Sequence, residues 1–253
     1  MTNIILSGCC GKMGRVITAC VSKRDDCKIV AGVDLNTDTS LGYPVYSSFA
    51  DITENADVII DFSHPSVLNN LLEFAKKHSL PLVLATTGFS ASQTEQIKKA
   101  ATDIPLFFTF NMSLGINLLV ALSKKAAAVL DGNFDIEIIE KHHNQKLDAP
   151  SGTAIMLAEA INETLDNKMM YEYDRHSKRE KRPENQIGIH SVRGGNIVGE
   201  HEVIFAGHDE VITLSHQATS KEVFAVGALK AALYMKGKSA GLYDMNNVIT
   251  LQN

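Results

Sequence analysis

The side chains best suited to chemistry lie in one short stretch, residues 140–154, which reads EKHHNQKLDAPSGTA. It contains two adjacent histidines, His142 and His143, and a lysine, Lys146. An imidazole can accept or donate a proton near neutral pH, and an ammonium group can donate a proton or attract an anion. The stretch therefore predicts a pocket for a small acidic molecule, with His142 as general acid or base and Lys146 as proton donor.

The second half of this stretch predicts the start of a helix. Ser151 is a good N-cap residue, and the apolar residues within 154–165 recur with helical spacing. A capping box would need Glu or Gln where Ala154 stands, so local side chains use only part of the first backbone N–H groups. Gly152 lets a ligand approach the backbone closely. Because a helix start attracts anions, we expect a substrate carboxylate to be bound by His143, Ser151, Gly152 and Thr153.

Less specific interpretations of the stretch stay open. Residues 134–139 alternate enough to predict a strand, so the histidines would lie in a strand-to-helix loop, where histidine and lysine are often simply solvated. Two histidines could also bind zinc, but no third ligand stands at the spacing of a zinc motif. We expect no metal.

A second group of residues, near the start of the chain, predicts a nucleotide site. Residues 4–6 predict a short buried strand, and the glycines that follow have the spacing G-x-x-G-x-x-G rather than G-x-G-x-x-G. A helical pattern comes next, and residues 28–33 predict a second strand that ends in a carboxylate, where a dinucleotide's ribose would be held. We expect the cofactor to be bound here by Gly8, Cys9, Cys10, Gly11, Lys12, Met13 and Asp34.

The residue type at position 34 also bears on which dinucleotide is used. A carboxylate favours the free 2′-hydroxyl of NADH and repels the 2′-phosphate of NADPH. We therefore expect a preference for NADH, although Lys12 or Arg15 could still bind a phosphate.

Three more apolar runs predict strands, and helical patterns separate them. The strands begin at residues 58, 82 and 106, and the helices span 66–78 and about 91–102. This alternation predicts an α/β fold with a Rossmann-type, doubly wound parallel sheet, whose ligands lie at the carboxyl ends of the strands. All three of these strand ends carry polar residues, at 63–65, 85–88 and 111–113, which turns with hydroxyl caps would explain equally well.

The second half of the chain predicts a different, α+β architecture. An apolar helix spans 114–130, and three β-like runs separated by glycine-containing turns predict an antiparallel meander. These runs are 187–193, 197–206 and 211–219. With the strand before His142 they would form an open mixed sheet of about four strands, while the polar segment 167–185 predicts a solvated loop. A helix follows at 221–235. An open sheet face favours association with a second copy.

The composition is that of an ordinary globular protein of 253 residues, with 45% hydrophobic and 21% charged residues. A net charge of −5 argues against nucleic acid as a partner. The chain shows neither a signal peptide nor an apolar run long enough for a membrane span, so we expect a cytoplasmic protein. The four cysteines fit no zinc or redox motif and are expected to be reduced; reaction of thiol reagents at Cys9 and Cys10 is a hypothesis.

The block E-x-H-H-x-x-K-x-D-A-P-S-G-T-A resembles the signature of the dihydrodipicolinate reductase family, and the resemblance extends over essentially the whole chain. It implies reduction of 4-hydroxy-tetrahydrodipicolinate, a cyclic dicarboxylate, with NADH or NADPH, in diaminopimelate and lysine biosynthesis. Family members that use both cofactors often have an arginine where Leu35 stands, and Ala85 replaces a usual glycine. The resemblance further implies a nicotinamide-side site formed by Ala85, Thr86, Thr87, Phe110, Asn111, Met112 and Ser113.

The resemblance also implies the domain organisation and the assembly. The last helix returns to the nucleotide-binding domain, which would then comprise residues 1–112 and 221–253. The substrate-binding and oligomerisation domain would comprise residues 113–220, and the protein would be a homotetramer. Two alternatives are another NAD(P)-dependent amino-acid or semialdehyde dehydrogenase and a non-enzymatic NAD(P)-binding regulator.

Overall fold

The computed structural model describes residues 1–250 and separates into two compact units. The first unit contains Met1–Leu114 and the chain from Lys221 onward, and the second contains Gly115–Ser220. The two units have separate hydrophobic cores, so each is described by itself.

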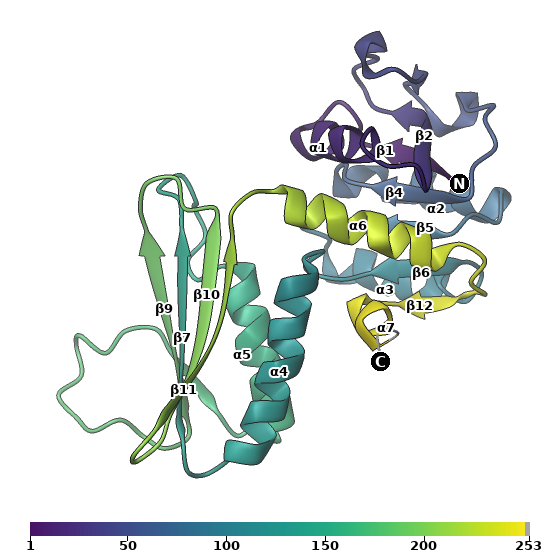
Figure 1. Ribbon diagram of the computed structural model, residues 1–253. Helices are drawn as coiled ribbons and strands as arrows, with labels where there is room; N and C mark the ends of the chain where they lie inside the picture. Colours follow the sequence, from purple (N-terminus) through teal and green to yellow (C-terminus); the bar gives the residue numbers. More distant parts are fainter. Residues whose placement is uncertain (251–253) are drawn as a thin grey trace. The chain divides into compact units, whose positions relative to one another are not determined.

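The first unit is built around a seven-stranded sheet with the order β12-β6-β5-β4-β1-β2-β3, in which all neighbouring strands are parallel (Figure 1). The strands are β1 (Thr2–Ser7), β2 (Cys27–Val33), β3 (Val45–Tyr46), β4 (Val58–Asp61), β5 (Leu82–Leu84), β6 (Pro105–Phe108) and β12 (Gly241–Tyr243). The predicted Rossmann-type sheet is confirmed. Strands β3 and β12 were not predicted because two or three residues are too few to show a pattern.

Five helices complete this unit: α1 (Lys12–Val21), α2 (Leu68–Lys77), α3 (Ala91–Ala100), α6 (Glu222–Met235) and α7 (Met245–Thr250). The central strands carry runs of apolar residues, at 4–6, 58–60 and 82–84, because both faces of the sheet are covered. Ile4 and Ile60 pack with α1 and α6 in one core, whereas Ile5 and Ile59 pack with α2 and α3 in the other. The expected helix at 66–78 begins later, at Leu68, after a 3-10 turn.

The second unit contains a five-stranded mixed sheet with the order β11-β10-β7-β9-β8. Its strands are β7 (Asp135–His142), β8 (Met170–Glu172), β9 (Gln186–Arg193), β10 (Gly199–Ala206) and β11 (Val211–Ala218). Helices α4 (Leu114–Leu130) and α5 (Gly152–Thr164) cover one face of this sheet in Figure 1. Within the described residues, no helix of this unit covers the other face.

The predicted antiparallel meander is wrong. β10 and β11 do form an antiparallel pair, but β9 and β10 are not neighbours, because β7 lies between them, antiparallel to β10 and parallel to β9. β7 takes the central place because its inward residues Ile136, Ile138 and Glu140 are all buried. The expected turn at 194–196 is real, but turn residues do not say which strands become neighbours.

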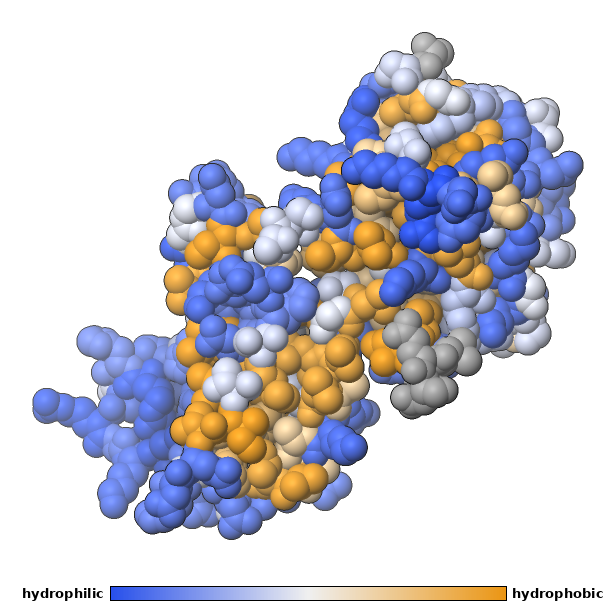
Figure 2. Space-filling view, in the orientation of Figure 1, coloured by the Kyte–Doolittle hydropathy of each residue, from blue (hydrophilic) through white to orange (hydrophobic). Residues whose placement is uncertain are grey.

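The polar segment 167–185 is not loop throughout, because β8 adds a fifth strand there. Hydrophilic side chains nevertheless dominate the long loop after β8, whereas hydrophobic ones gather over α4 (Figure 2). None of the helices within residues 1–250 combines the length and the apolar character that a membrane crossing requires.

Candidate active site

The centre of the stretch 140–154 is a carboxylate that the sequence analysis did not single out. Glu140 is fully buried on β7. Its two oxygens accept hydrogen bonds from both terminal nitrogens of Arg193, at 2.7 and 2.8 Å, and from the backbone N–H of Ser151, at 3.1 Å. Burial by itself disfavours the charged form, but hydrogen bonds from Arg193 first, and then from His142 and Ser191, lower the pKa of Glu140 to about 2. Glu140 is therefore an ionised, buried anchor.

His142 lies two residues further along β7 and faces the same side of the sheet. Its Nδ1 is 2.5 Å from Oε2 of Glu140. An ionised carboxylate can only accept, so Nδ1 carries the hydrogen and Nε2 is left as the acceptor of the neutral ring. Burial lowers the pKa of His142, against the opposing effect of Glu140. The arrangement thus presents Nε2 of His142 as a hydrogen-bond acceptor or base at neutral pH.

The expected helix start is confirmed: α5 has Ser151 as its N-cap, and Oγ accepts from the N–H of Ala154 at 3.2 Å. Oγ also lies 3.0 Å from Nε2 of His201, a buried histidine whose pKa is lowered to about 3 by burial. Ser151 is only 2% exposed, and its amide is bonded to Glu140. These internal bonds show that Ser151 fixes the helix start, and its predicted contact with a substrate stays a prediction.

The next residues of the helix start are more open. Gly152 is exposed, and a Cβ added to it would meet nothing within 4 Å. Thr153 and His143 are half-buried. No acidic residue stands in the first turn of α5, although the carboxylate of Glu140 accepts from the N–H of the N-cap Ser151. The geometry fits a carboxylate at Gly152.

Lys146 belongs to the loop between β7 and α5. Its Nζ is 2.8 Å from Oδ1 of Asp148, and this ion pair lowers the pKa of Asp148. Arg193 also donates to the backbone oxygen of Asp148, at 2.6 Å, and so connects the loop to Glu140. Arg193 thus connects the two predicted residues, because it bonds both to Glu140, the partner of His142, and to Asp148, the partner of Lys146. Arg193 comes from β9 and was not predicted.

The glycine-rich loop of the first unit leaves room for a phosphate. Gly8 has φ of +77°, and a Cβ at this position would lie 2.5 Å from the oxygen of Phe62. A Cβ at Gly14 would lie 2.3 Å from the oxygen of Gly8, so only glycine allows the turn and the helix to pack this closely. α1 begins without a side-chain cap and without an acidic residue in its first turn. These features fit the pyrophosphate of a dinucleotide.

The carboxylate at the end of β2 is tied to this loop. Asp34 accepts from the backbone N–H of Cys10 at 3.0 Å and from that of Asn36 at 3.1 Å. Lys12, the first residue of α1, is exposed. Cys9 is fully buried, so its side chain belongs to the core and only its backbone could contact a cofactor. The neighbouring Leu35 is 97% exposed.

Two cavities in the first unit share a wall formed by Phe62 and Ser63. The larger, about 570 Å³, includes Gly8, Gly11 and Asp34 in its lining. The other, about 440 Å³, contains most of the residues expected on the nicotinamide side, and it also contains Met13 of the glycine loop. The expected residues in its lining are Ala85, Thr86, Thr87, Phe110, Asn111 and Met112. Together the two cavities match the two halves of a dinucleotide. The remaining predicted residue, Ser113, is buried, and its amide donates to Oδ1 of Asn111.

Three residues of this site were missed. Asp61, almost fully buried at the end of β4, accepts hydrogen bonds of 2.6 Å from Ser63 and Thr86, and its burial raises the pKa of its carboxyl. It therefore braces two of the strand-end loops. Lys221 and Phe224 line the 440 Å³ cavity. A short D-F-S motif could have indicated Asp61. No local pattern indicates Lys221 and Phe224, because they lie far along the chain from the other residues of this cavity.

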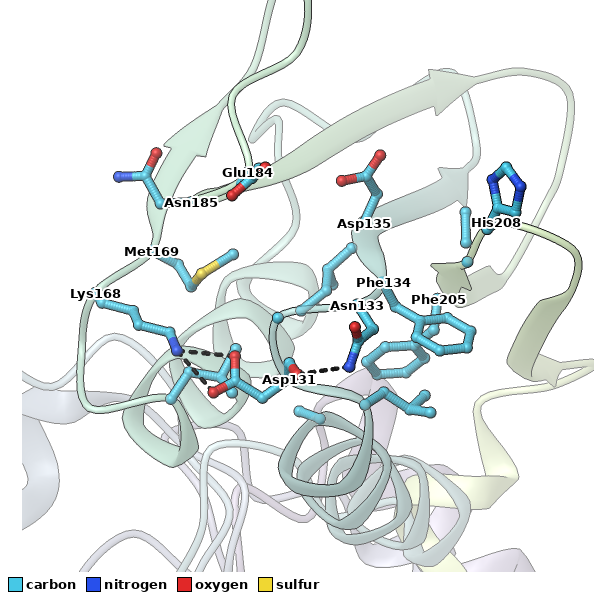
Figure 3. A pocket seen from close by; sticks show the side chains of 17 residues that line it. Asp131, Asn133, Phe134, Asp135, Lys168, Met169, Glu184, Asn185, Phe205 and His208 are labelled. Carbon is cyan, nitrogen blue, oxygen red and sulfur yellow. Dashed lines mark hydrogen bonds and ion pairs between the residues drawn. The ribbon is translucent and has the colours of Figure 1, made fainter.

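The second unit has a cavity of about 460 Å³ (Figure 3). Its lining includes Asp135 at the start of β7, whereas His142 ends that strand. Phe134 and Phe205 lie on one side of it, and Lys168 pairs with Asp131 on the other, at 2.7 and 2.8 Å. Its only histidine, His208, is 98% exposed and has no buried partner. This cavity therefore lacks the held acid–base groups of the Glu140 cluster.

Comparison with known proteins covers both units. The family models described as "Dihydrodipicolinate reductase, N-terminus" and "Dihydrodipicolinate reductase, C-terminus" match residues 2–112 and 115–249. The chain is 53% identical over 249 residues to the 4-hydroxy-tetrahydrodipicolinate reductase of Caldanaerobacter subterraneus subsp. tengcongensis, covering 98% of each chain. It is 50% identical over 253 residues to that of Clostridium novyi, covering 100% of each. A dipicolinate-bound dihydrodipicolinate reductase from Paenisporosarcina sp. TG-14 matches with a TM-score of 0.82 and 26% identity, over 97% of this chain and 99% of that one.

Proposed function

The chain belongs to the dihydrodipicolinate reductase family, and from this premise we propose how its residues perform the 4-hydroxy-tetrahydrodipicolinate reductase reaction. The protein is an NAD(P)H-dependent oxidoreductase of diaminopimelate and lysine biosynthesis that acts on a small molecule. The alternatives of a different dehydrogenase or a non-enzymatic regulator give way to this activity.

The observation that supports the proposal best is the ionised Glu140 beneath His142. Reduction of the ring with loss of water needs a hydride and a proton, so the protein must deliver the proton. When bound, the dinucleotide supplies the hydride. Glu140 holds the hydrogen of His142 on Nδ1, which leaves Nε2 as an acceptor. His142 therefore acts as the base that takes up or relays a proton.

Lys146 is then the proton donor. An ammonium carries a proton at neutral pH, whereas burial keeps the ring of His142 neutral. Asp148 holds the Lys146 ammonium at 2.8 Å. This contact fixes the donor without using all three of its N–H groups.

The substrate's carboxylate is placed by the start of α5. The N–H groups of Gly152 and Thr153 point along the positive end of the helix dipole, and His143 adds a further donor. A negative group bound there would lie next to the loop that carries Lys146. The start of α5 would therefore position the substrate, and His142 and Lys146 would move the proton.

The glycine loop, Asp34 and the residues around Phe62 would hold the dinucleotide. We infer that NADH is preferred over NADPH, because Asp34 would repel a 2′-phosphate and the exposed Leu35 offers no positive charge beside it.

The residue roles can be tested with His142→Gln and Lys146→Ala. Each variant should lower kcat by about 10²- to 10⁴-fold, the usual contribution of general acid–base catalysis. Fluorescence titration should give an unchanged Kd for NADH, and a titration with dipicolinate should separate loss of binding from loss of proton transfer. Near-normal turnover of both variants would contradict the assignment.

We further propose a cytoplasmic homotetramer assembled through the open face of the second unit's sheet. This face carries Ile139 and Ile204 next to the ion pairs of Lys141 with Glu200 and Glu202. Association with a second copy of the chain would bury the apolar residues of this open face. Light scattering after size exclusion that finds only a 27.5 kDa species would refute the assembly.

A further inference from the structure

Two thiols and a carboxylate converge at the glycine-rich loop. Cys9 and Cys10 have their Sγ atoms 3.9 Å apart. With a carboxylate oxygen of Asp34, all three donor atoms lie within 4.8 Å of one another. Within residues 1–250, this is the only group of His, Cys, Asp and Glu side chains that meets this criterion for holding one metal ion. The sequence does not indicate this group of three side chains. Cys9 and Cys10 are neighbours, but Asp34 follows the next strand, and the three residues match no metal-motif spacing.

The spacing fits a tetrahedral ion of the zinc class. Zinc binds thiolate at about 2.3 Å, so two sulfurs on one tetrahedral ion lie about 3.8 Å apart. The observed 3.9 Å between Cys9 and Cys10 needs almost no adjustment. We propose that Cys9, Cys10 and Asp34 form a binding site for one soft divalent cation, such as Zn²⁺ or Cd²⁺, with the fourth position open to solvent.

The first of the three donors lies beside the core, because Cys9 is fully buried. The ion displaces one proton from each thiol, both protons pass to solvent, and no electron is transferred. The two thiolates then neutralise the ion's charge, which offsets the cost of placing charge beside the core.

Binding of the ion would exclude the dinucleotide. Asp34 is the residue expected to hold the ribose, and the backbone N–H of Cys10 belongs to the loop expected to hold the pyrophosphate. An ion coordinated by these residues would occupy the carboxylate that is expected to hold the ribose. The metal site stands without the cofactor assignment, and only the competition rests on the proposed function.

The test is a titration of the full-length reduced protein with Cd²⁺, whose bonds to thiolate sulfur give an ultraviolet charge-transfer absorption that histidine and carboxylate sites do not produce. We expect one equivalent of Cd²⁺ to produce this band. Cys10→Ser and, separately, Cys9→Ser should weaken Cd²⁺ binding by more than about 100-fold, beyond the 10- to 100-fold that outer-shell partners of a metal contribute. Cys20→Ser, which removes a half-buried cysteine outside the group, is the matched control and should keep the band.

Addition of NADH should remove the band, and Cd²⁺ should raise the apparent Kd of NADH in proportion to its concentration. An equal band in the wild type and in Cys10→Ser would overturn the metal site. A band that persists while NADH fluorescence reports saturation would overturn the competition. Failure of NADH to bind the metal-free protein would instead count against the cofactor assignment and leave the metal site standing.

Discussion

Replacing the buried carboxylate Glu140 by glutamine should destabilise the second unit by about 3 kcal/mol at neutral pH. Glutamine keeps the shape but removes the charge that Arg193 neutralises through two hydrogen bonds. The NH₂ group of glutamine is itself a donor. It would face the N–H group of Arg193, His142 or Ser151 from which the carboxylate oxygen accepted a hydrogen bond. Loss of one partner of a buried ion pair typically costs about 3–5 kcal/mol.

The pKa of Glu140 gives a second route to the same magnitude. A lowering from 4.5 to about 2 corresponds to about 3 kcal/mol, at about 1.4 kcal/mol per unit of pKa. Because the folded-state pKa is the lower one, this stabilisation is fully present above pH 4.5 and is lost as the pH falls towards 2. The wild-type advantage over Glu140→Gln should therefore fall from about 3 kcal/mol at pH 7 to about 2 kcal/mol at pH 3.5.

The assay is urea unfolding of both proteins at several pH values and one fixed protein concentration, since assembly makes the apparent stability concentration-dependent. Glu137→Gln is the matched control on the same strand. Glu137 pairs with Arg182 and His190 but is partly exposed, so its loss should cost no more than about 1 kcal/mol. A Glu140→Gln variant within 0.5 kcal/mol of wild type at pH 7, or a difference that does not shrink in acid, would refute the reasoning.

Three further substitutions test other parts of the site. Gly14→Ala should weaken NADH binding and cost about 1–3 kcal/mol of stability, because its Cβ would lie 2.3 Å from a backbone oxygen; unchanged NADH titration and melting curves would contradict this. Leu35→Arg should raise kcat/KM with NADPH relative to NADH about tenfold, and an unchanged ratio would remove position 35 from cofactor choice. Gly199→Ala would place a Cβ 3.2 Å from Nε2 of His142; kcat should fall about tenfold or more at constant NADH Kd, whereas a normal kcat would mean that the ring needs no fixed position.

The parts of the fold that follow from local pattern were predictable, and the parts that depend on pairing were not. The helix at 114–130 and the alternating strands and helices of the first unit follow from hydrophobic periodicity. The order of strands in the second sheet does not, because β9 has the same apolar alternation whether it pairs with β7 or β10. Which strand takes the central place depends on how all the strands pack together, and this is a property of the whole sheet.

The candidate site shows the same division. His142, Lys146 and the helix start at Ser151 belong to one contiguous block, so the sequence could place them together. Arg193 and His201 come from strands about 50 residues away and enter the site only because β9 and β10 flank β7. The return of α6 to the first unit followed from the family resemblance, but the place of Lys221 in the wall of the 440 Å³ cavity did not follow from any local pattern.

The different surroundings of two adjacent histidines follow from the alternation of a single strand. The inward positions of β7 are Ile136, Ile138, Glu140 and His142, so the face that builds the apolar core ends in an acid–base pair. Such a pair can be buried only if every acceptor is satisfied, and Arg193 and the N–H of Ser151 meet that requirement. The imidazole of His143 follows the end of the strand and has no such partner within the described residues, since its buried Nδ1 makes no hydrogen bond. Burial with a fixed carboxylate therefore supports the proposed proton chemistry of His142, and the unpaired Nδ1 of His143 supports its proposed contact with a ligand.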